Sequence, residues 1–144
     1  MSTRAAGTLV IAHDTGRVLL LRRSDGQGWD QPGGHQDPAD DADAAANAVR
    51  EFEEETGIDA AGLDCRDSFV IRRMPDGRHV TFMPRPPSRA DLEYTVFVCT
   101  FPSEFVPVLS HEHTGWGWFE PESPPPDTIP GTMLALNVLQ QKGY

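Results

Sequence analysis

The sequence predicts an α/β sandwich, in which a mixed β-sheet is packed between helices. Short apolar segments rich in β-branched residues alternate with turn residues, a run of strong helix formers interrupts them, and a second helical run lies near the C-terminus. This order of strands, helix, strands and helix favours a sheet that is covered by helices. The chain has 144 residues and shows no internal repeat, so we expect a single domain over residues 1–144.

The N-terminal half is predicted to hold a β-hairpin followed by a helix. Residues 8–12 and 18–21 are apolar and β-forming, and the turn Asp14-Thr15-Gly16 separates them. Polar, glycine-rich and acidic loops follow. Asp43 is a suitable N-cap and Gly57 a suitable C-terminal cap for the strong helix formers between them, which predicts a helix over residues 44–56.

The C-terminal half is predicted to hold further strands and a closing helix. The turn Pro75-Asp76-Gly77 separates two β-forming segments. We expect strands over residues 63–73, 79–83, 94–101 and 116–119, and a helix over residues 132–140. The connection over residues 123–130 is rich in proline.

The charge of the chain limits its partners. A formal net charge of -10 gives no diffuse positive field, so we expect neither long nucleic acid nor an anionic membrane as a partner. Acidity suits a protein that binds divalent cations, although it also simply aids solubility. The apolar run over residues 5–12 is too short for a membrane span or a secretory signal, which favours a cytoplasmic protein.

The two cysteines show no pattern of a known site. Cys65 and Cys99 form no CxxC pair and no zinc-ligand spacing. In a reducing cytosol we expect both to be free thiols.

One face of the predicted helix is apolar. Ala45, Ala48, Val49 and Phe52 recur at the i, i+3, i+4 and i+7 spacing of a buried stripe. We therefore expect these side chains to pack against the sheet.

The same helix carries four glutamates within five positions, a clustering that like-charge repulsion disfavours for stability alone. Glu51, Glu54 and Glu55 are related by i+3 and i+4 spacing and share a face, whereas Glu53 points elsewhere. Three carboxylates on one face offer the oxygen ligands that Mg²⁺ prefers, and a bound cation relieves their repulsion. A solvated acidic face is the alternative.

A glycine turn upstream supports a metal site. In the compact, turn-rich segment 29–34, Pro32-Gly33-Gly34 lets the backbone approach a ligand and exposes its carbonyls. Gly34 followed by Arg50-Glu51-Phe52-x-Glu54-Glu55-x-Gly57-Ile58 resembles the Nudix box. In that family, glycine, five residues, glutamate and seven residues precede Arg-Glu-apolar-x-Glu-Glu-x-Gly-apolar. The second half of this chain's motif is similar to Nudix (MutT-like) hydrolases at every defined position.

The first half of the motif departs from the family pattern. Asp40 stands where the family has glutamate, and the stretch from Asp40 to Arg50 is two residues longer. An insertion in the loop before the helix explains both differences. Asp40, Asp41 or Asp43 then replaces the missing glutamate.

The resemblance implies a Nudix-type α/β/α sandwich and hydrolysis of a pyrophosphate bond in a small nucleotide substrate, with Mg²⁺ or Mn²⁺ as cofactor. It makes Glu54 and Glu55 the main metal ligands and the Gly34 carbonyl another. Glu51 becomes a further ligand or orients the nucleophilic water, and Arg50 holds Glu51 by a charge-assisted hydrogen bond. Metal ions neutralise phosphate oxygens and lower the pKa of bound water.

A second segment, residues 110–119, resembles the Glu-His-x-x-aromatic-x-Trp-apolar stretch of many Nudix members. This resemblance makes Glu112 the candidate fourth carboxylate, as a metal ligand or a general base. An ordinary loop glutamate is the alternative. His111 and His113 are expected to contact phosphate or to be exposed.

Aromatic and basic side chains are further candidates for substrate contacts. Trp118 is expected in the core, whereas Trp116 or Trp29 either stacks on a base or packs internally. Some arginines are expected to bind phosphate and others to be surface charges, the candidates being Arg22, Arg23, Arg72, Arg73, Arg78, Arg85 and Arg89. The proline-rich loop over residues 84–89 is expected to border the pocket.

Two further functions compete with a pyrophosphohydrolase. A Nudix fold that binds a nucleotide without cleaving it is one, although such proteins usually lack box carboxylates. An isoprenoid isomerase is the other, and it would need a cysteine nucleophile in a setting that Cys65 and Cys99 lack. Among nucleotides, a nucleoside triphosphate or a dinucleoside polyphosphate is favoured by analogy. We expect a monomer or a homodimer.

Overall fold

The computed structural model describes residues 3–37, 40, 43–81 and 92–144. Its elements, in chain order, are β1 (Thr3–Ala12), β2 (Val18–Arg23), β3 (Trp29–Asp30), β4 (Gly33–His35), α1 (Ala44–Thr56), η2 (Ala60–Gly62), β5 (Asp64–Arg73), β6 (His79–Val80), β7 (Leu92–Phe101), β8 (His113–Phe119) and α2 (Pro130–Gln141).

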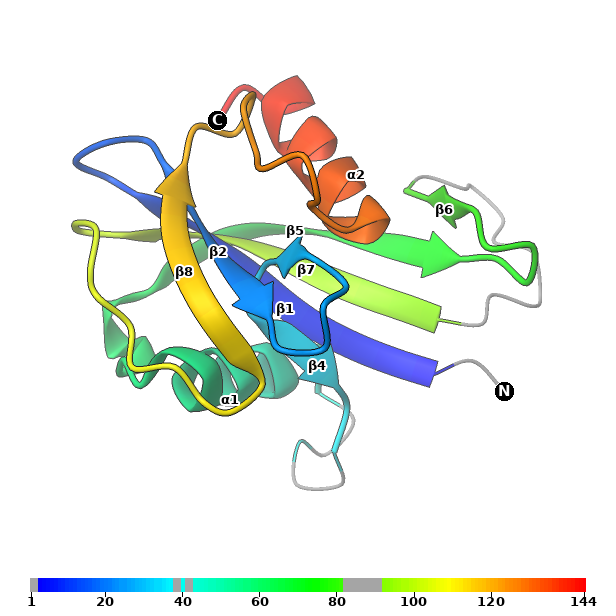
Figure 1. Ribbon diagram of the computed structural model, residues 1–144, viewed down its shortest axis with the longest axis horizontal. Coiled ribbons are helices and arrows are strands. Elements are labelled where there is room, and N and C mark those ends of the chain that lie inside the picture. Colours follow the sequence, from blue (N-terminus) through cyan, green and yellow to red (C-terminus); the bar gives the residue numbers. More distant parts are fainter. Residues whose placement is uncertain (1–2, 38–39, 41–42, 82–91) are drawn as a thin grey trace.

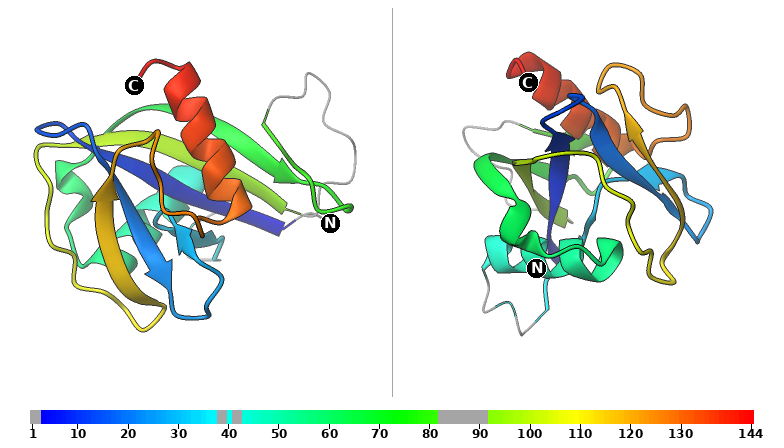
Figure 2. Two further views of the ribbon diagram at one scale, coloured as in Figure 1. Left: turned by 45° about the horizontal axis from the view of Figure 1, so that its top comes forward. Right: turned by 90° about the vertical axis from the view of Figure 1, so that its left-hand side faces the viewer.

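The described strands form one mixed sheet that lies between the two α-helices. Its order is β3-β2-β1-β7-β5-β6, with β4 paired to β1 and β8 paired to β2. β1 and β7 run parallel, from Thr3 opposite Leu92 to Ala12 opposite Phe101, and the other named pairs are antiparallel. α1 and α2 cover opposite faces of this sheet (Figures 1 and 2). The predicted α/β sandwich is therefore confirmed.

Each face of the sheet has its own hydrophobic core. Leu9 and Ile11 of β1 pack in a cluster with Leu136 of α2. Val10, which lies between them in the chain, packs in a second cluster with Phe52 of α1. Because successive side chains of a strand point to opposite faces, a strand that is covered on both sides must be apolar throughout. The continuous apolar run over residues 8–12 meets this requirement.

Helix α1 has the predicted bounds and the predicted caps. The side chain of Asp43 accepts a hydrogen bond from the backbone N of Ala45 at 2.9 Å, and Gly57 ends the helix with a φ of 69°. A positive φ is readily adopted by glycine, which explains the sharp end of the helix. Neither α1 nor α2, the α-helices of the described residues, is long and apolar enough to cross a membrane.

Two of the four residues that were predicted to form the buried stripe of α1 are exposed, so this part of the prediction was wrong. Ala48 and Phe52 are buried, but Ala45 is exposed and Val49 is 40% exposed. The helix is rotated so that its buried face also contains Asn47, Glu51, Glu55 and Thr56. Polar groups can occupy a buried face where they find hydrogen-bond partners, and β4 supplies several of these partners.

Several strands differ from their predicted bounds. β1 begins at Thr3, five residues before the predicted start, because β7 pairs with it along its whole length. The segment expected to be only a compact turn contains the short strands β3 and β4. β6 is restricted to His79–Val80, and the expected pocket-bordering loop over residues 84–89 lies outside the described residues.

The expectation of two free thiols was wrong, because Cys65 and Cys99 form a disulfide. The two residues lie opposite each other on β5 and β7. They are separated by 34 residues in the sequence, and only the register of the sheet makes them neighbours. Sequence spacing alone therefore gave no sign of the pairing.

We expect the denatured, non-reduced protein to contain no titratable thiol, and to show two after reduction. Replacing both Cys65 and Cys99 by serine should lower the free energy of unfolding by about 2–4 kcal/mol, because the cross-link restricts the unfolded chain. The shift of the urea midpoint measures this loss. Equal midpoints for the variant and the oxidised parent would contradict the disulfide.

Candidate functional site

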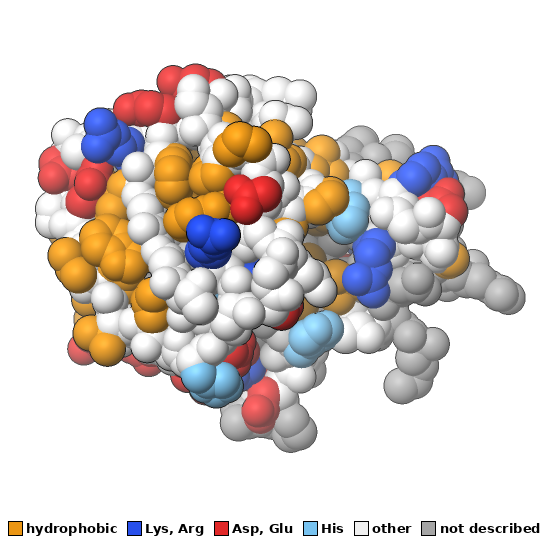
Figure 3. Space-filling model, in the orientation of Figure 1, with side chains coloured by type: hydrophobic (Ala, Val, Ile, Leu, Met, Phe, Trp, Pro, Cys, Tyr) orange, Lys and Arg blue, Asp and Glu red, His pale blue; other side chains and the backbone are white. Residues whose placement is uncertain are grey.

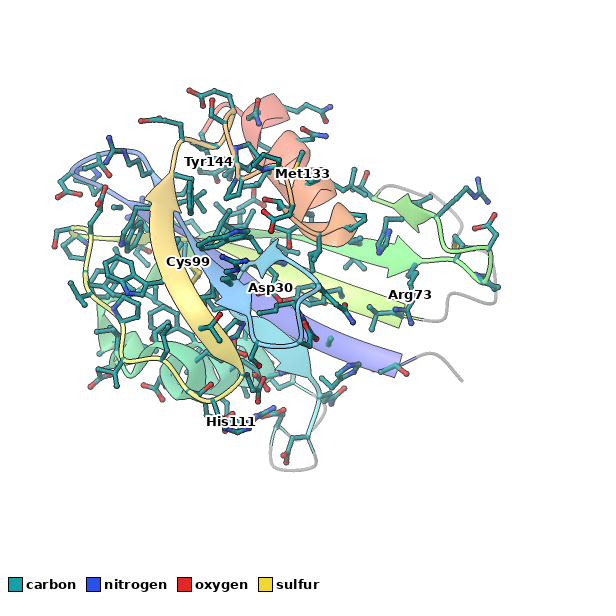
Figure 4. The ribbon with its side chains drawn as sticks, viewed as in Figure 1. Asp30, Arg73, Cys99, His111, Met133 and Tyr144 are labelled. Carbon is teal, nitrogen blue, oxygen red and sulfur yellow. A yellow bond between two sulfur atoms is a disulfide. The ribbon has the colours of Figure 1, made fainter. Side chains whose placement is uncertain are left out.

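A cleft of about 1020 Å³ brings together residues from distant parts of the chain, including Gly34, Arg50, Glu51, Glu54 and Glu112. Its size is that of a small-molecule site. Acidic, basic and histidine side chains gather at the lower part of the face in Figure 3. Figure 4 places Asp30, which also lines the cleft, near the middle of the molecule, and Arg73 at the end of β5.

Strand β4 is bound to α1 through three consecutive residues. The backbone N of Gly33 donates to Oε1 of Glu55 at 2.9 Å. Nδ2 of Asn47 donates to the Gly34 carbonyl at 3.2 Å, and Nη2 of Arg50 donates to the His35 carbonyl at 3.2 Å. These contacts fix the glycine strand relative to the helix that carries the glutamates.

Gly34 lies directly against the carboxylate of Glu51. A Cβ on Gly34 would stand 2.6 Å from Cδ of Glu51 and 2.7 Å from each of its oxygens. Real Cβ atoms do not approach other atoms this closely, so the backbone and the carboxylate can meet only at a glycine. The structure therefore brings together Gly34 and Glu51, two of the candidate ligands.

Arg50 is the centre of an ionic network. Its Nε and Nη2 contact the two carboxylate oxygens of Asp40 at 3.0 and 3.1 Å. Its Nη1 lies 3.0 Å from Oε1 of Glu51 and 3.2 Å from Oε2 of Glu54. Hydrogen bonding to Arg50 lowers the pKa of Asp40. Of the three candidate aspartates, Asp43 caps the helix, Asp41 lies outside the described residues, and Asp40 pairs with Arg50 of the motif.

Glu51 and Glu55 are buried, whereas the side chain of Glu54 is 56% exposed. Burial raises the pKa of Glu55 to about 9; the Gly33 N–H opposes this rise, and the charges of Glu51, Asp30 and Glu112 add to it. Burial likewise raises the pKa of Glu51, against the opposing charge of Arg50. For both buried carboxyl groups, the surroundings thus favour the protonated form over the charged one.

The metal-free protein is expected to lose stability as pH rises from about 5 to about 9. In this range folded Glu55 keeps a proton that the unfolded chain, with the ordinary carboxyl pKa of 4.5, has released. Stability falls with pH wherever the folded state binds more protons. Thermal melts in EDTA measure the effect, which Glu55→Gln should reduce. A melting temperature of the parent that does not fall over this range would contradict it.

The sequence interpretation missed Asp30, which lines both the cleft and the small recess beside it. Asp30 is 8% exposed, and its Oδ2 pairs with Nη1 of Arg23 at 3.0 Å. Its Oδ1 lies 3.3 Å from Nε2 of His113, so His113 is buried rather than exposed. Asp30, His113, Glu55 and Glu112 border a recess of about 150 Å³. The available signal was an aspartate two residues before Pro32-Gly33-Gly34, inside the compact segment 29–34.

Tyr94 and Gln31 were also missed, and both line the cleft. The hydroxyl of Tyr94 occupies the space where a Cβ would stand on Gly7 or Gly33. Burial raises the pKa of Tyr94, and the nearby charge of Asp30 adds to the rise. The hydroxyl of Thr132 donates to Oε1 of Gln31. These groups form a neutral polar wall beside the carboxylates.

The aromatic candidates lie away from this cleft. Trp118 is partly buried, and its Nε1 donates to the Phe105 carbonyl at 3.0 Å, in agreement with a core role. Trp29 packs edge-on against Phe119, and Trp116 is 38% exposed. Among the described residues that line the cleft, neither Trp29 nor Trp116 is included.

The arginine candidates that the structure describes separate into those that line the cleft and those that do not. Arg23 and Arg73 line the cleft together with Arg50, whereas Arg22, Arg72 and Arg78 are not among its described lining residues. Arg85 and Arg89 lie outside the described residues. His111 is exposed and borders the small recess beside Glu112.

Within the described ranges, no three His, Cys, Asp or Glu side chains are arranged as a preformed metal centre. The arrangement of Arg50 accounts for part of this, since its guanidinium bridges Glu51 and Glu54. Glu55 is held separately by the Gly33 N–H. The oxygens of these groups are nevertheless the kind that hard divalent cations bind.

Comparison with known proteins gives consistent matches. The chain matches the NUDIX domain family over residues 1–135. It is 44% identical over 83 residues to a Bacillus subtilis (strain 168) protein named "Putative 8-oxo-dGTP diphosphatase", covering 57% of this chain but only 53% of that protein. It is 29% identical over 127 residues to the asymmetrical bis(5'-nucleosyl)-tetraphosphatase of Rattus norvegicus, covering 82% of this chain and 79% of the relative.

Among solved structures, the fold is similar to that of a C. elegans Ap4A hydrolase in a binary complex. The TM-score is 0.69 at 23% sequence identity, and the match covers 99% of each chain. The likeness supports the fold.

Proposed function

Because the chain belongs to the NUDIX domain family, we propose that it hydrolyses a pyrophosphate bond in a nucleoside diphosphate linked to another group. One observation carries the proposal. Gly34 contacts Glu51 at a cleft that Glu54 and Glu112 also line, with Glu55 one helical turn further along α1 and bonded to the same glycine strand.

The residues of the cleft and of the adjoining small recess fit a divalent cation. Glu51 and Glu55 are buried carboxylates with raised pKa values, and a cation would stabilise their ionised forms. Carboxylate and carbonyl oxygens suit Mg²⁺ and Mn²⁺. We assign as ligands Glu51, Glu54, Glu55, Glu112 and the carbonyl of Gly34. Glu54 would leave Arg50 to take part, which its exposed position permits.

The chain's own residues have separate roles in this proposal. When bound, the cation neutralises phosphate oxygens and lowers the pKa of water. Arg50 holds Glu51 against Gly34, where Glu51 binds the cation or orients the nucleophilic water. Asp40 replaces the first glutamate of the motif by anchoring Arg50. Glu112 is a ligand or the general base.

The favoured substrates are nucleoside triphosphates and dinucleoside polyphosphates. The names of the bacterial and rat relatives support these two classes. Arg23 and Arg73 line the cleft and supply positive charge for phosphate groups. The net charge of -10 argues against long nucleic acid as a substrate.

A substrate panel tests the proposal. Oxidised and normal nucleoside triphosphates, dinucleoside polyphosphates, ADP-ribose and nucleotide sugars would be incubated with Mg²⁺, Mn²⁺ or EDTA, and the products identified by mass. We expect cleavage of a pyrophosphate bond only with metal, and isotopically labelled water identifies the phosphorus attacked. Tight nucleotide binding without turnover in either metal would instead favour a ligand-sensing protein.

A further inference from the structure

We infer that Asn47 is a positioning residue, which holds the carbonyl of Gly34 in the direction needed to bind the divalent cation. The inference rests on the proposed function only in that the Gly34 carbonyl is a metal ligand. Asn47 acts through Gly34 and has no proposed contact with the substrate.

Helix propensity does not explain why an asparagine stands at position 47 of α1. It interrupts an alanine run over residues 44–48, and asparagine is a poorer helix former than alanine. Its side chain is nevertheless on the buried face of α1, where the residue is 1% exposed. A buried amide costs stability unless its polar atoms find partners. For Nδ2 of Asn47, these partners are two carbonyls of β4.

The contacts of Asn47 converge on Gly34. Nδ2 donates to the Gly34 carbonyl at 3.2 Å and lies 3.5 Å from the His35 carbonyl. Glu51, four residues further along α1, places its carboxylate against the Cα of the same glycine. One face of α1 therefore contacts Gly34 through two side chains, one at the carbonyl oxygen and one at the Cα.

The hydrogen bond from Asn47 affects how the Gly34 carbonyl can act as a metal ligand. A carbonyl oxygen has two lone pairs, and the hydrogen bond from Asn47 engages one of them. The bond helps to fix the direction of the carbonyl, which also lies opposite Ala6 in the antiparallel ladder of β1 and β4. Groups that orient a metal ligand in this way typically change metal affinity by about 10–100-fold when they are removed.

A purely structural role makes a different prediction. Glu55 and Arg50 also bind β4, through Gly33 and His35, so attachment of β4 to α1 does not depend on Asn47 alone. If Asn47 served only as a further attachment, its loss would lower stability without a specific loss of metal affinity. Metal affinity compared at matched stability separates the two roles.

The test measures Mn²⁺ binding to the full chain by electron paramagnetic resonance of the free ion, together with thermal melts. Asn47→Leu keeps a branched side chain of similar shape without the donor, and Asn47→Ala serves if the leucine variant does not fold. Ala48→Gly weakens the same helix next to Asn47 and is the matched control. We expect the Mn²⁺ dissociation constant to rise about tenfold or more on loss of the amide, and by less than about twofold in the control.

The outcomes also separate this inference from the proposed function. Weaker Mn²⁺ binding in the Asn47 variant that folds supports the inference even if no nucleotide in the panel is hydrolysed. Unchanged Mn²⁺ binding overturns it even if the parent protein is an active hydrolase. A parent that binds no Mn²⁺, or a control that weakens binding as much as the Asn47 variants, overturns it as well.

Discussion

Replacing Glu55 by glutamine is expected to lower the kcat of nucleotide hydrolysis by about 10³-fold, because a metal contributes several kcal/mol to transition-state stabilisation and each ~1.4 kcal/mol is tenfold in rate. The metal-free fold should tolerate this change. The pKa of Glu55 is raised to about 9, so the side chain is protonated and neutral near pH 7. Glutamine has nearly the same shape, and its carbonyl oxygen can accept the hydrogen bond that Gly33 donates to Glu55.

Glu53→Gln is the matched control for this prediction. Glu53 belongs to the same helix but is exposed, and it accepts a hydrogen bond from the backbone N of Ala60 that an amide oxygen can also accept. Its variant should keep a kcat close to that of the parent. Steady-state assays with a substrate identified in the panel, run with thermal melts in EDTA, measure both effects. Full activity of Glu55→Gln, alone or combined with Glu54→Gln, would contradict the assignment of the metal ligands.

The features that the sequence predicted well are those with strong local signals. Asp43 and Gly57 delimit α1 because each cap is a property of one residue and its adjacent turn. The apolar run over residues 8–12 predicted a strand because a strand buried on both faces has no polar alternation. The motif from Arg50 to Ile58 likewise identified the family, since its spacing is fixed by the end of one helix and the cap that follows it.

The features that were missed depend on contacts between distant segments. Glu51 and Glu55 are buried in place of Ala45 and Val49. Glu55 finds a polar partner on β4, and Glu51 pairs with Arg50 beside Gly34. The apolar periodicity of the helix gives no information on such polar contacts. The pairing of Cys65 with Cys99 depends on the register of β5 and β7.

Asp30 and Asn47 were missed for a related reason. Each has its buried partners in another part of the chain: Asp30 contacts His113 of β8, and Asn47 contacts Gly34 of β4. A motif defined within one helix and one loop does not contain these pairs.

Gly34→Ala is expected to lower kcat/KM by about 10²-fold or more, since a misplacement of about 1 Å in a site can cost that much. The added Cβ would stand 2.6 Å from Cδ of Glu51, so either the Glu51 carboxylate or β4 must move. Movement of β4 would also lengthen the hydrogen bond that Asn47 donates to residue 34. Activity assays and a crystal structure of the variant measure the displacement and its effect.

Gly115→Ala separates this local effect from the general cost of replacing a glycine in the sheet. A Cβ on Gly115 would meet Cβ of Arg22 at 3.5 Å, which is ordinary van der Waals contact, and Gly115 is outside the described lining of the cleft. The control should therefore keep its activity while Gly34→Ala loses it. If both variants were equally active, the close approach of Gly34 to Glu51 would have no role in catalysis, and the carbonyl of Gly34 would lose its main structural support as a ligand. If only the Gly34 variant failed, the contact between the glycine strand and the helix would be the element on which the chemistry depends.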